Sequence, residues 1–528
     1  MYKLLLTLVI IPGLVLCQTT KKITPVIPFS KDEITEGKRE AASYFKSENY
    51  RTAKMFYERL VASDANDVDY NYKLALCYLN TNISKEKAIP LLEYVVNANS
   101  KDIPANAIYD LGRAYHYGGY FDKAKESFEK FRVAKKGVVD AKLKLEQWVS
   151  WSNNAIEMIA SPIVATFENL GKGINSSGSD YKPVTSVNDS VVYFTSSRKG
   201  NTGGQVDELG DITSDIYYFI QGDSSRSKAK NAGMNINTLY YEECLSVNMS
   251  GDKMLIYMEG MEANGDIFIT DLKGKQWNKA VSLGKAFVTK AMETGACLSP
   301  DGLTLYFSAE AEGSKTGKDI YRCTRTEQTT WSKPERLSDK INTKEDEDYP
   351  VIWVDGKTLF FSSKGHKGMG GYDIYKSVVN NPAEGFSAPE NIGYPLNSTY
   401  DDQGIGLNAD GKTLYLAAVR DSGYGEYDIY KVKLNESLVM NKMCHLSGVG
   451  LTALNAPAKG CIVTVNDAAS GALIYTLTTN EASGKFDVAL PTGSYKVALR
   501  HPKMGKVEEE VLINAVESSE ITVFFTFK

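Results

Sequence analysis

The sequence is poor in the residues that most often carry chemistry. Its 528 residues include only four histidines, His116, His366, His445 and His501, and these are scattered without ligand-like spacing. The spacing therefore predicts no zinc site. Seven cysteines do not make a disulfide framework in a chain of this length. Cys444 and Cys461 flank an expected hairpin and are placed to form a disulfide, but buried free thiols are the favoured interpretation.

Long hydrophobic runs are also missing, except at the N-terminus. The apolar run from Leu4 to Leu16 is shorter than the ~20 residues that span a bilayer, which predicts a signal peptide over residues 1–17. Two processing routes remain open, namely cleavage before Gln18 and lipid attachment at Cys17. Leu16 stands where a lipidation motif carries a small residue, which favours cleavage. We expect an exported protein of the periplasm, associated with the outer membrane only through a lipid or a partner.

Neither charge nor motifs point to nucleic acid or to catalysis. The net charge is −5, with no basic footprint for nucleic acid. The glycines of residues 365–371, GHKGMGG, lie between two expected strands, so no helix N-terminus is available there for a phosphate. We found no nucleophile elbow and no Cys–His pairing. The expectation is therefore a protein that is not an enzyme, with no catalytic residue, metal or cofactor.

Residues 32–160 have a helical pattern that repeats. Small residues recur at Ala53, Ala88 and Ala124, with spacings of 35 and 36 residues. This period is typical of helix–turn–helix units that stack into a solenoid. Residues 111–124 carry Leu-Gly, Ala-Tyr, Tyr and Ala at positions that resemble tetratricopeptide (TPR) repeats. That resemblance implies a groove for partner peptides, with five tyrosines as candidate contacts or packing residues: Tyr44, Tyr72, Tyr78, Tyr109 and Tyr115.

Residues 165–435 repeat with a longer period. The motif Asp-Ile-Tyr or a close variant recurs at intervals of 51, 53, 54 and 55 residues, which predicts five equivalent units. Asp-Gly turns in the later units are typical of hairpins, and each unit reads as four short strands. Four strands in each of five units predict a five-bladed β-propeller. The motif aspartates are Asp215, Asp266, Asp319, Asp373 and Asp428.

The last unit lacks a fourth strand, whereas an unassigned strand begins at Thr166, before the first unit. We therefore expect this early strand to complete the fifth blade. The repeats resemble the WD40-like PD40 repeats of TolB-like propellers. Residues 445–528 contain short strands and the run GKFDVALPTGSY, which resembles the carboxypeptidase regulatory-like domain, a small β-sandwich. The predicted fold class is therefore multidomain, α plus all-β.

An acidic residue lies eight positions before each predicted hairpin turn. If these positions begin the channel-lining strands, five carboxylates ring one mouth of the propeller and attract a cation or a basic segment. The alternative is that each acid accepts hydrogen bonds within the repeat. The five residues are Asp180, Glu243, Glu293, Glu347 and Asp402.

The order of the three domains resembles the PorE-like envelope proteins of Bacteroidetes. This resemblance implies a scaffold of the type IX secretion and gliding machinery, with envelope proteins as partners through the TPR groove and the propeller. The family's OmpA-like, peptidoglycan-binding domain would begin where this sequence ends, at Lys528, so direct peptidoglycan binding is not carried over. An alternative function is an envelope glycan or ligand sensor that uses the propeller mouth.

Overall fold

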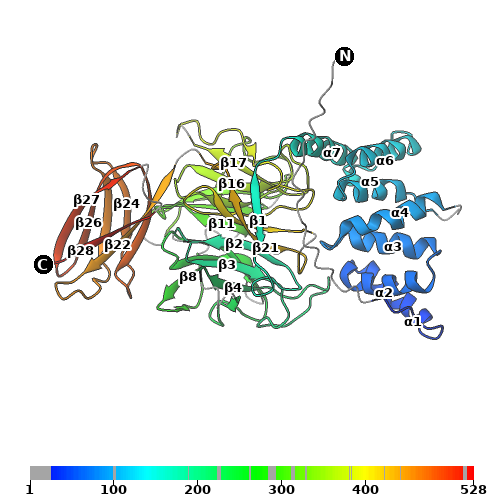
Figure 1. The fold of residues 1–528 in the computed structure, drawn as a ribbon, viewed down its shortest axis with the longest axis horizontal. Helices are drawn as coiled ribbons and strands as arrows, with labels where there is room; N and C mark the ends of the chain where they lie inside the picture. The colour runs from blue at the N-terminus through cyan, green and yellow to red at the C-terminus, as the bar shows by residue number, and fades with distance from the viewer. Residues whose placement is uncertain are drawn as a thin grey trace, which may run out of the picture.

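The computed structural model contains a helical solenoid, a β-propeller and a β-sandwich arranged in a row (Figure 1). It describes residues 25–98, 103–187, 189–222, 228–260, 263–283, 293–310, 316–326, 330–379, 381, 383–420, 423–439, 442–514 and 520–528. The predicted signal peptide, residues 1–17, which includes Cys17, lies outside these residues. No helix in the described part of the chain is long and apolar enough to cross a membrane.

Within the described residues, seven α-helices form the solenoid at one end of the molecule. Consecutive helices pack as antiparallel pairs, and fully buried alanines, including Ala53, Ala88 and Ala124, allow the close approach that the sequence predicted. The solenoid core also contains buried aromatic rings such as Tyr57 and Phe128. The helices are α1 (Ile34–Lys46), α2 (Tyr50–Ser63), α3 (Val68–Leu79), α4 (Ala88–Asn97), α5 (Ala107–Tyr117), α6 (Phe121–Ala134) and α7 (Leu145–Ala160).

In the described part of the following segment, five antiparallel sheets form the blades of the propeller. The first is β2 (Asp180–Thr185), β3 (Val191–Ser196), β4 (Asp215–Ile220) and β5 (Lys230–Asn231). The second is β6 (Tyr241–Val247), β7 (Lys253–Gly260), β8 (Ala263–Lys273) and β10 (Val281–Ser282), with β9 (Gln276–Trp277) beside β8. The third is β11 (Glu293–Leu298), β12 (Thr304–Ala309), β13 (Asp319–Thr324) and β14 (Glu335–Arg336). The fourth is β15 (Glu347–Ile352), β16 (Thr358–Ser363), β17 (Asp373–Val378) and β18 (Glu390–Asn391).

The fifth blade is completed by the early strand, as the sequence predicted. Strand β1 (Ala165–Asn169) pairs antiparallel with β21 (Asp428–Leu434), which is followed in the sheet by β20 (Thr413–Ala418) and β19 (Gly406–Leu407). The propeller is thus closed by residues far apart in sequence. Closure removes the sheet edge that an open array would expose.

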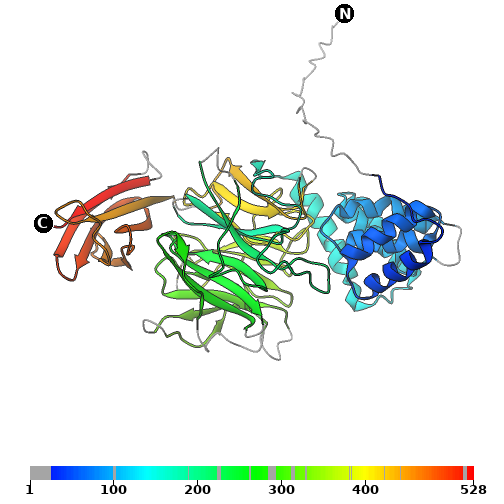
Figure 2. The ribbon, with the colours of Figure 1, turned by 90° about the horizontal axis from the view of Figure 1, so that it is seen from below.

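The sandwich covers the opposite end of the propeller from the solenoid (Figures 1 and 2). Ala489 of the sandwich packs in one cluster with Val187 and Trp353, which follow first strands of two blades. One sheet is β25 (Lys485–Pro491), β22 (Met443–Leu451) and β28 (Glu520–Thr526), and the other is β24 (Leu473–Thr478), β23 (Ile462–Asp467), β26 (Gly493–His501) and β27 (Gly505–Ile513). Cys444 and Cys461 are buried free thiols in this domain, and no disulfide joins them.

A buried asparagine fastens the third strand of a blade to the loop that leads to the next blade. In the fourth blade, Asn397 is fully buried and accepts a hydrogen bond from the Ile374 N–H (2.8 Å) while donating to the Ile374 carbonyl (2.8 Å). Ile374 is the middle residue of an Asp-Ile-Tyr motif. The same two bonds join Asn175 to Ile429, Asn237 to Ile216, and Asn342 to Ile320.

We expect Asn397→Ala to destabilise the propeller by about 2 to 4 kcal/mol. The substitution leaves the buried N–H of Ile374 without this partner, and an unsatisfied buried group costs ~1–3 kcal/mol. The Ile374 carbonyl keeps its bond from the Ile392 N–H (3.1 Å) but loses the bond from Asn397, which adds about 1 kcal/mol. Urea unfolding followed by tryptophan fluorescence measures the change. Asn435→Ala, at an exposed position of the fifth blade, is the control and should change stability little. Equal effects of the two substitutions would contradict this role for Asn397.

Candidate functional site

The candidate site is the joint between the helical solenoid and one face of the propeller. The loops that precede the Asp-Ile-Tyr motifs of blades one, four and five reach this face and contact the helices. Glu208 accepts a hydrogen bond from Asn49 (3.2 Å) at its carbonyl, and Gly368 accepts one from Asn154 (2.8 Å) in the same way. Gly210 approaches Asn49 so closely that an added Cβ would lie 2.5 Å from its Oδ1, at a backbone φ of +85°. Glycine is therefore required there.

The motif aspartates hold these loops in place. Asp215 Oδ2 accepts hydrogen bonds from the N–H and the hydroxyl of Thr202, each at 2.8 Å. Asp373 Oδ2 accepts from the N–H groups of Met369 (2.9 Å) and Gly370 (3.0 Å). Asp428 accepts from the N–H groups of Tyr424 (2.7 Å) and Gly425 (3.1 Å). The repeated aspartate therefore acts as an anchor for the loops that meet the solenoid.

The other two motif aspartates have different surroundings. Asp319 forms an ion pair with Arg336 at 2.8 Å, where blades one, four and five carry asparagine. Asp266 in the second blade is half-buried, and this burial raises the pKa of its carboxyl group.

Met369 is the apolar centre of the joint. Its side chain is 1% exposed and packs with Phe121 and Ala155 of the solenoid. His116 lies beside it, and its Nε2 donates to the Met369 carbonyl (3.0 Å), because a carbonyl can only accept. Burial lowers the pKa of His116 to about 4, so the ring is neutral at pH 7. The Gly-rich segment that carries Met369 is thus a docking loop.

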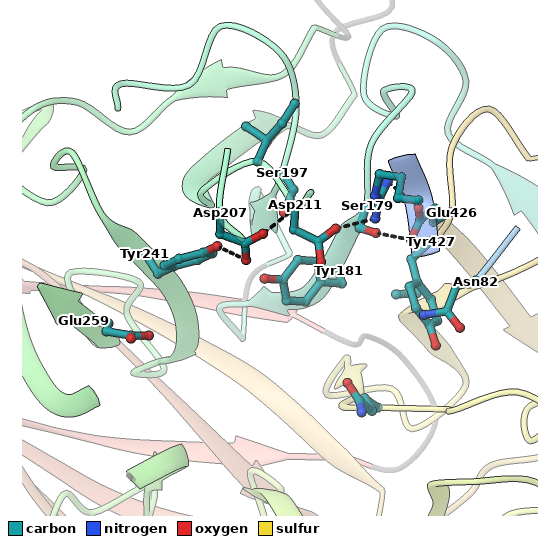
Figure 3. A pocket seen from close by; sticks show the side chains of 14 residues that line it. Asn82, Ser179, Tyr181, Ser197, Asp207, Asp211, Tyr241, Glu259, Glu426 and Tyr427 are labelled. Atoms are coloured by element: carbon teal, nitrogen blue, oxygen red, sulfur yellow. Dashed lines mark hydrogen bonds and ion pairs between the residues drawn. The ribbon is translucent and has the colours of Figure 1, made fainter. Parts of the chain in front are cut away.

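Arg51 makes the most highly charged contact across the joint. From α2 its guanidinium pairs with both Asp211 and Glu426, which lie on loops of blades one and five. Beside it is a hollow of about 430 Å³ at the propeller mouth (Figure 3). Three tyrosines line this hollow, together with two further carboxylates: Tyr181, Tyr241, Tyr427, Asp207 and Glu259. We call this space the mouth hollow.

The predicted acid ring is not an exposed ring. Asp180, Glu293 and Glu347 are 0% exposed, and Asp402 is 3% exposed. Three of these acids accept short bonds from the N–H four residues earlier: Asp180 from Ser176, Glu347 from Thr343 and Asp402 from Ser398, each at 2.6 Å. They hold the entrance of each first strand.

The alignment of the second blade was wrong by one residue. Glu242 is fully buried and accepts from the Thr238 N–H (2.9 Å), as the equivalent acids do in other blades. Glu243 instead lies in the channel, where it accepts from the Tyr181 hydroxyl (2.8 Å) and pairs with Lys182. In four blades, an asparagine lies five residues before the buried acid and a serine or threonine lies four residues before it. This pattern would have identified Glu242 from the sequence.

Polar side chains from several blades meet inside the propeller, and we call this cluster the plug. Lys182 and Tyr349 occupy equivalent positions in β2 and β15, both with positive φ angles of 51° and 53°. The Lys182 ammonium lies 4.4 Å from the centre of the Tyr349 ring. Asp348 accepts from Thr294 (2.8 Å) and pairs with Lys318 (2.9 Å). The plug ties four blades together across the channel.

A second hollow, of about 550 Å³, follows the inner helices α3, α5 and α7 and ends at the propeller loop of Lys364 and Gly371. We call it the composite groove, because both domains line it. Trp148 and Trp151 form an edge-to-face pair at 5.0 Å, and Arg113 lies 5.6 Å from the Trp148 ring. Its other lining residues include Tyr72, Tyr109, Asp110, Lys142 and Lys144.

The five solenoid tyrosines therefore divide into two groups. Tyr72 and Tyr109 line the composite groove. Tyr44 packs on Phe56. Tyr78 and Tyr115 donate hydrogen bonds to Glu58 (2.7 Å) and Glu93 (2.6 Å) of preceding helices.

Among the residues that the structure describes, no group of three or more His, Cys, Asp or Glu side chains is arranged to hold a metal.

The fold and the joint define the class of this chain as a multidomain propeller protein. No protein family model matches it, and no curated protein matches it. Solved structures with a similar fold include TolB from Acinetobacter baumannii, which is 14% identical, with a TM-score of 0.32 over 56% of this chain and 70% of that one.

Two further solved structures have similar sequence identities and TM-scores. A putative TolB from Agrobacterium tumefaciens is 14% identical, with a TM-score of 0.31 over 62% of this chain and 98% of that one. An alpha-L-arabinofuranosidase from Lactobacillus brevis is 13% identical, with a TM-score of 0.31 over 50% of this chain and 92% of that one. At these identities the similarity concerns the fold alone.

We expect Met369→Ala to weaken the joint by about 2 to 5 kcal/mol, the usual cost of removing a buried methionine side chain. The solenoid should then unfold at a lower temperature than the propeller. Differential scanning calorimetry measures this as a split or broadened transition. Met234→Ala, at a side chain that is 84% exposed, is the control. An unchanged thermogram for Met369→Ala would show that this contact does not couple the domains.

Asp373 gives the joint a pH dependence. Burial raises its pKa to about 7, against ~3.9 for an exposed aspartate. Well below pH 4 the folded and unfolded forms are both protonated, and the folded state loses stability as the pH rises from about 4 to about 7, above which both forms are ionised. Asp373→Asn removes this titration, so its stability relative to wild type should rise between about pH 4 and pH 7 and stay level above pH 7. Urea unfolding at several pH values measures the difference.

The control for that experiment is Asp122→Asn, because the Asp122 side chain is 92% exposed. Its stability relative to wild type should stay nearly constant over the same range. A constant difference for Asp373→Asn as well would contradict the raised pKa.

Proposed function

We propose that the protein is a non-enzymatic scaffold of a bacterial envelope assembly, of the type IX secretion and gliding kind. The proposal includes export to the periplasm, association with the outer membrane through a partner or a lipid, and envelope proteins as partners. The observation that supports it best is the composite groove, which both the solenoid and the propeller line. No cofactor has a role in it.

The composite groove suits an extended segment of a protein partner. Its paired indole rings and two tyrosines offer flat apolar surfaces, which are enriched where binding energy concentrates. Its charge is mainly positive. Arg113 is balanced by Asp110 (3.1 Å), whereas Lys142 is exposed and lies at the rim. A segment with acidic and apolar residues is the partner chemistry that fits.

The joint supports a scaffold because it fixes the groove relative to the propeller. Three kinds of contact cross it: the buried Met369, hydrogen bonds to loop carbonyls, and ion pairs such as Lys144–Glu345 at 2.5 Å. The motif carboxylates at this face hold loops through hydrogen bonds, a structural use that agrees with a non-enzymatic role.

A second candidate function is a sensor for an envelope glycan or another small ligand. The mouth hollow favours it, because hydroxyl groups, carboxylates and aromatic rings converge on one space of about 430 Å³. A thermal shift with envelope glycans, without any protein partner, would support this alternative.

We expect Lys142→Glu combined with Trp151→Ala to reduce recovery of protein partners at least about tenfold. The first change reverses a rim charge and the second removes half of the indole pair. Crosslinking in cells, followed by affinity purification and mass spectrometry, measures the recovery. Lys130→Glu on α6, which is 63% exposed, is the matched charge control. Unchanged recovery with the double variant would contradict the groove as the partner site.

A further inference from the structure

The mouth hollow already contains a guanidinium group. Arg51 extends from the second residue of α2 to the propeller, where its Nη2 pairs with Asp211 Oδ1 and its Nη1 pairs with Glu426 Oε1. Two carboxylates from different blades thus bind opposite ends of one planar cation. This is the geometry in which arginine is preferred over lysine, because its donors form a rigid fork.

The buried negative charge of Glu426 is compensated by the Arg51 guanidinium. Its side chain is 5% exposed, and burial raises the pKa of its carboxyl group while Arg51 lowers it. Its Oε1 receives no hydrogen bond from the described residues, so the ion pair with Arg51 is its partner. Removing one partner of a buried charge pair is costly, because the other charge then remains uncompensated. Without Arg51 in the mouth hollow, Glu426 would therefore favour the binding of any other cation that reached it.

The hollow has room beyond Arg51. Figure 3 shows Tyr241 and Glu259 on one side of the space and Tyr427 and Asn82 on the other. Tyr241 donates to Asp207 Oδ2 (2.6 Å), so the far wall is also acidic. Four carboxylates line the hollow, and Arg51 is the cation among its lining residues. The aromatic faces suit the aliphatic stem and the flat head of an arginine side chain.

We propose that the propeller mouth is a receptor for an arginine side chain of a protein partner, and that Arg51 occupies it within the chain when no partner is bound. The partner's guanidinium replaces that of Arg51 on Glu426 and Asp211. This site is separate from the composite groove and does not depend on it. The proposal for the propeller mouth and the proposal for the composite groove can therefore be supported or contradicted independently.

Arg51 also explains how the site is regulated. The Arg51 side chain is 33% exposed and Asp211 is 46% exposed, so water and a partner reach the pair from one side. A partner must compete with a guanidinium that is tethered to the same molecule and therefore present at high effective concentration. Wild-type protein binds a free arginine peptide weakly, and removal of Arg51 exposes the full affinity of the site.

The test uses the full chain with Arg51→Ala and the peptide acetyl-Gly-Arg-Gly-amide. Isothermal titration calorimetry at low salt should show binding to Arg51→Ala at least about tenfold tighter than to wild type. The double variant Arg51→Ala/Glu426→Gln should lose this gain, and a glutamate peptide of the same length should not bind. The lysine peptide should bind more weakly than the arginine peptide, because it cannot bridge both carboxylates.

The control separates the pocket from the joint. Lys367→Ala removes another ion pair across the domains, with Glu157, both partners being about two thirds exposed. It should leave peptide affinity at the wild-type level. Equal affinity of wild type and Arg51→Ala would overturn the proposal, and so would tight binding by the Glu426→Gln double variant. If that variant is unstable, Arg51→Ala/Asp211→Asn serves in its place, with a partial loss expected.

Discussion

The architecture depends on a carboxylate that accepts hydrogen bonds from backbone N–H groups at the entrance of a β-strand. In blades one, four and five this carboxylate is the aspartate of Asp-Ile-Tyr, and it fixes the loop that precedes it. Those loops carry Asp211, Met369 and Glu426, the residues that meet the solenoid. One local hydrogen-bond pattern, repeated around the ring, therefore builds the surface on which a second domain rests.

Much of the fold could be predicted because it is periodic. The helical period, the regular interval between motif aspartates and the unassigned strand at Thr166 each follow from local propensity repeated along the chain. The Gly-rich segment before Asp373 was also interpreted as a loop. Its glycine at 370 has a structural reason, since an added Cβ would lie 2.5 Å from the carbonyl oxygens of Ser398 and Tyr400 in the neighbouring blade.

The candidate site was less predictable for two physical reasons. Counting back from the turn placed Glu243 in the repeat because Gly251 was aligned with the aspartate of the Asp-Gly turns. In the structure Gly251 is the equivalent of their glycine: its N–H donates to the carbonyl three residues earlier at a positive φ, as those of Gly302 and Gly356 do, so the count was one residue too late. The joint was missed because its contacts are single residues from segments far apart in sequence. Nothing near Arg51 in the sequence signals that its partners lie at 211 and 426.

We infer that the solenoid and the propeller form one rigid unit, held by the anchored loops. The six cysteines in the described part of the chain are buried, so spin labels can be placed selectively at exposed positions. Met55 on α2 is 62% exposed and Met234 on the propeller is 84% exposed, and both can be replaced by labelled cysteine. Double electron–electron resonance between them should give one narrow distance distribution. A broad or two-peaked distribution would show that the domains move independently and would contradict the account.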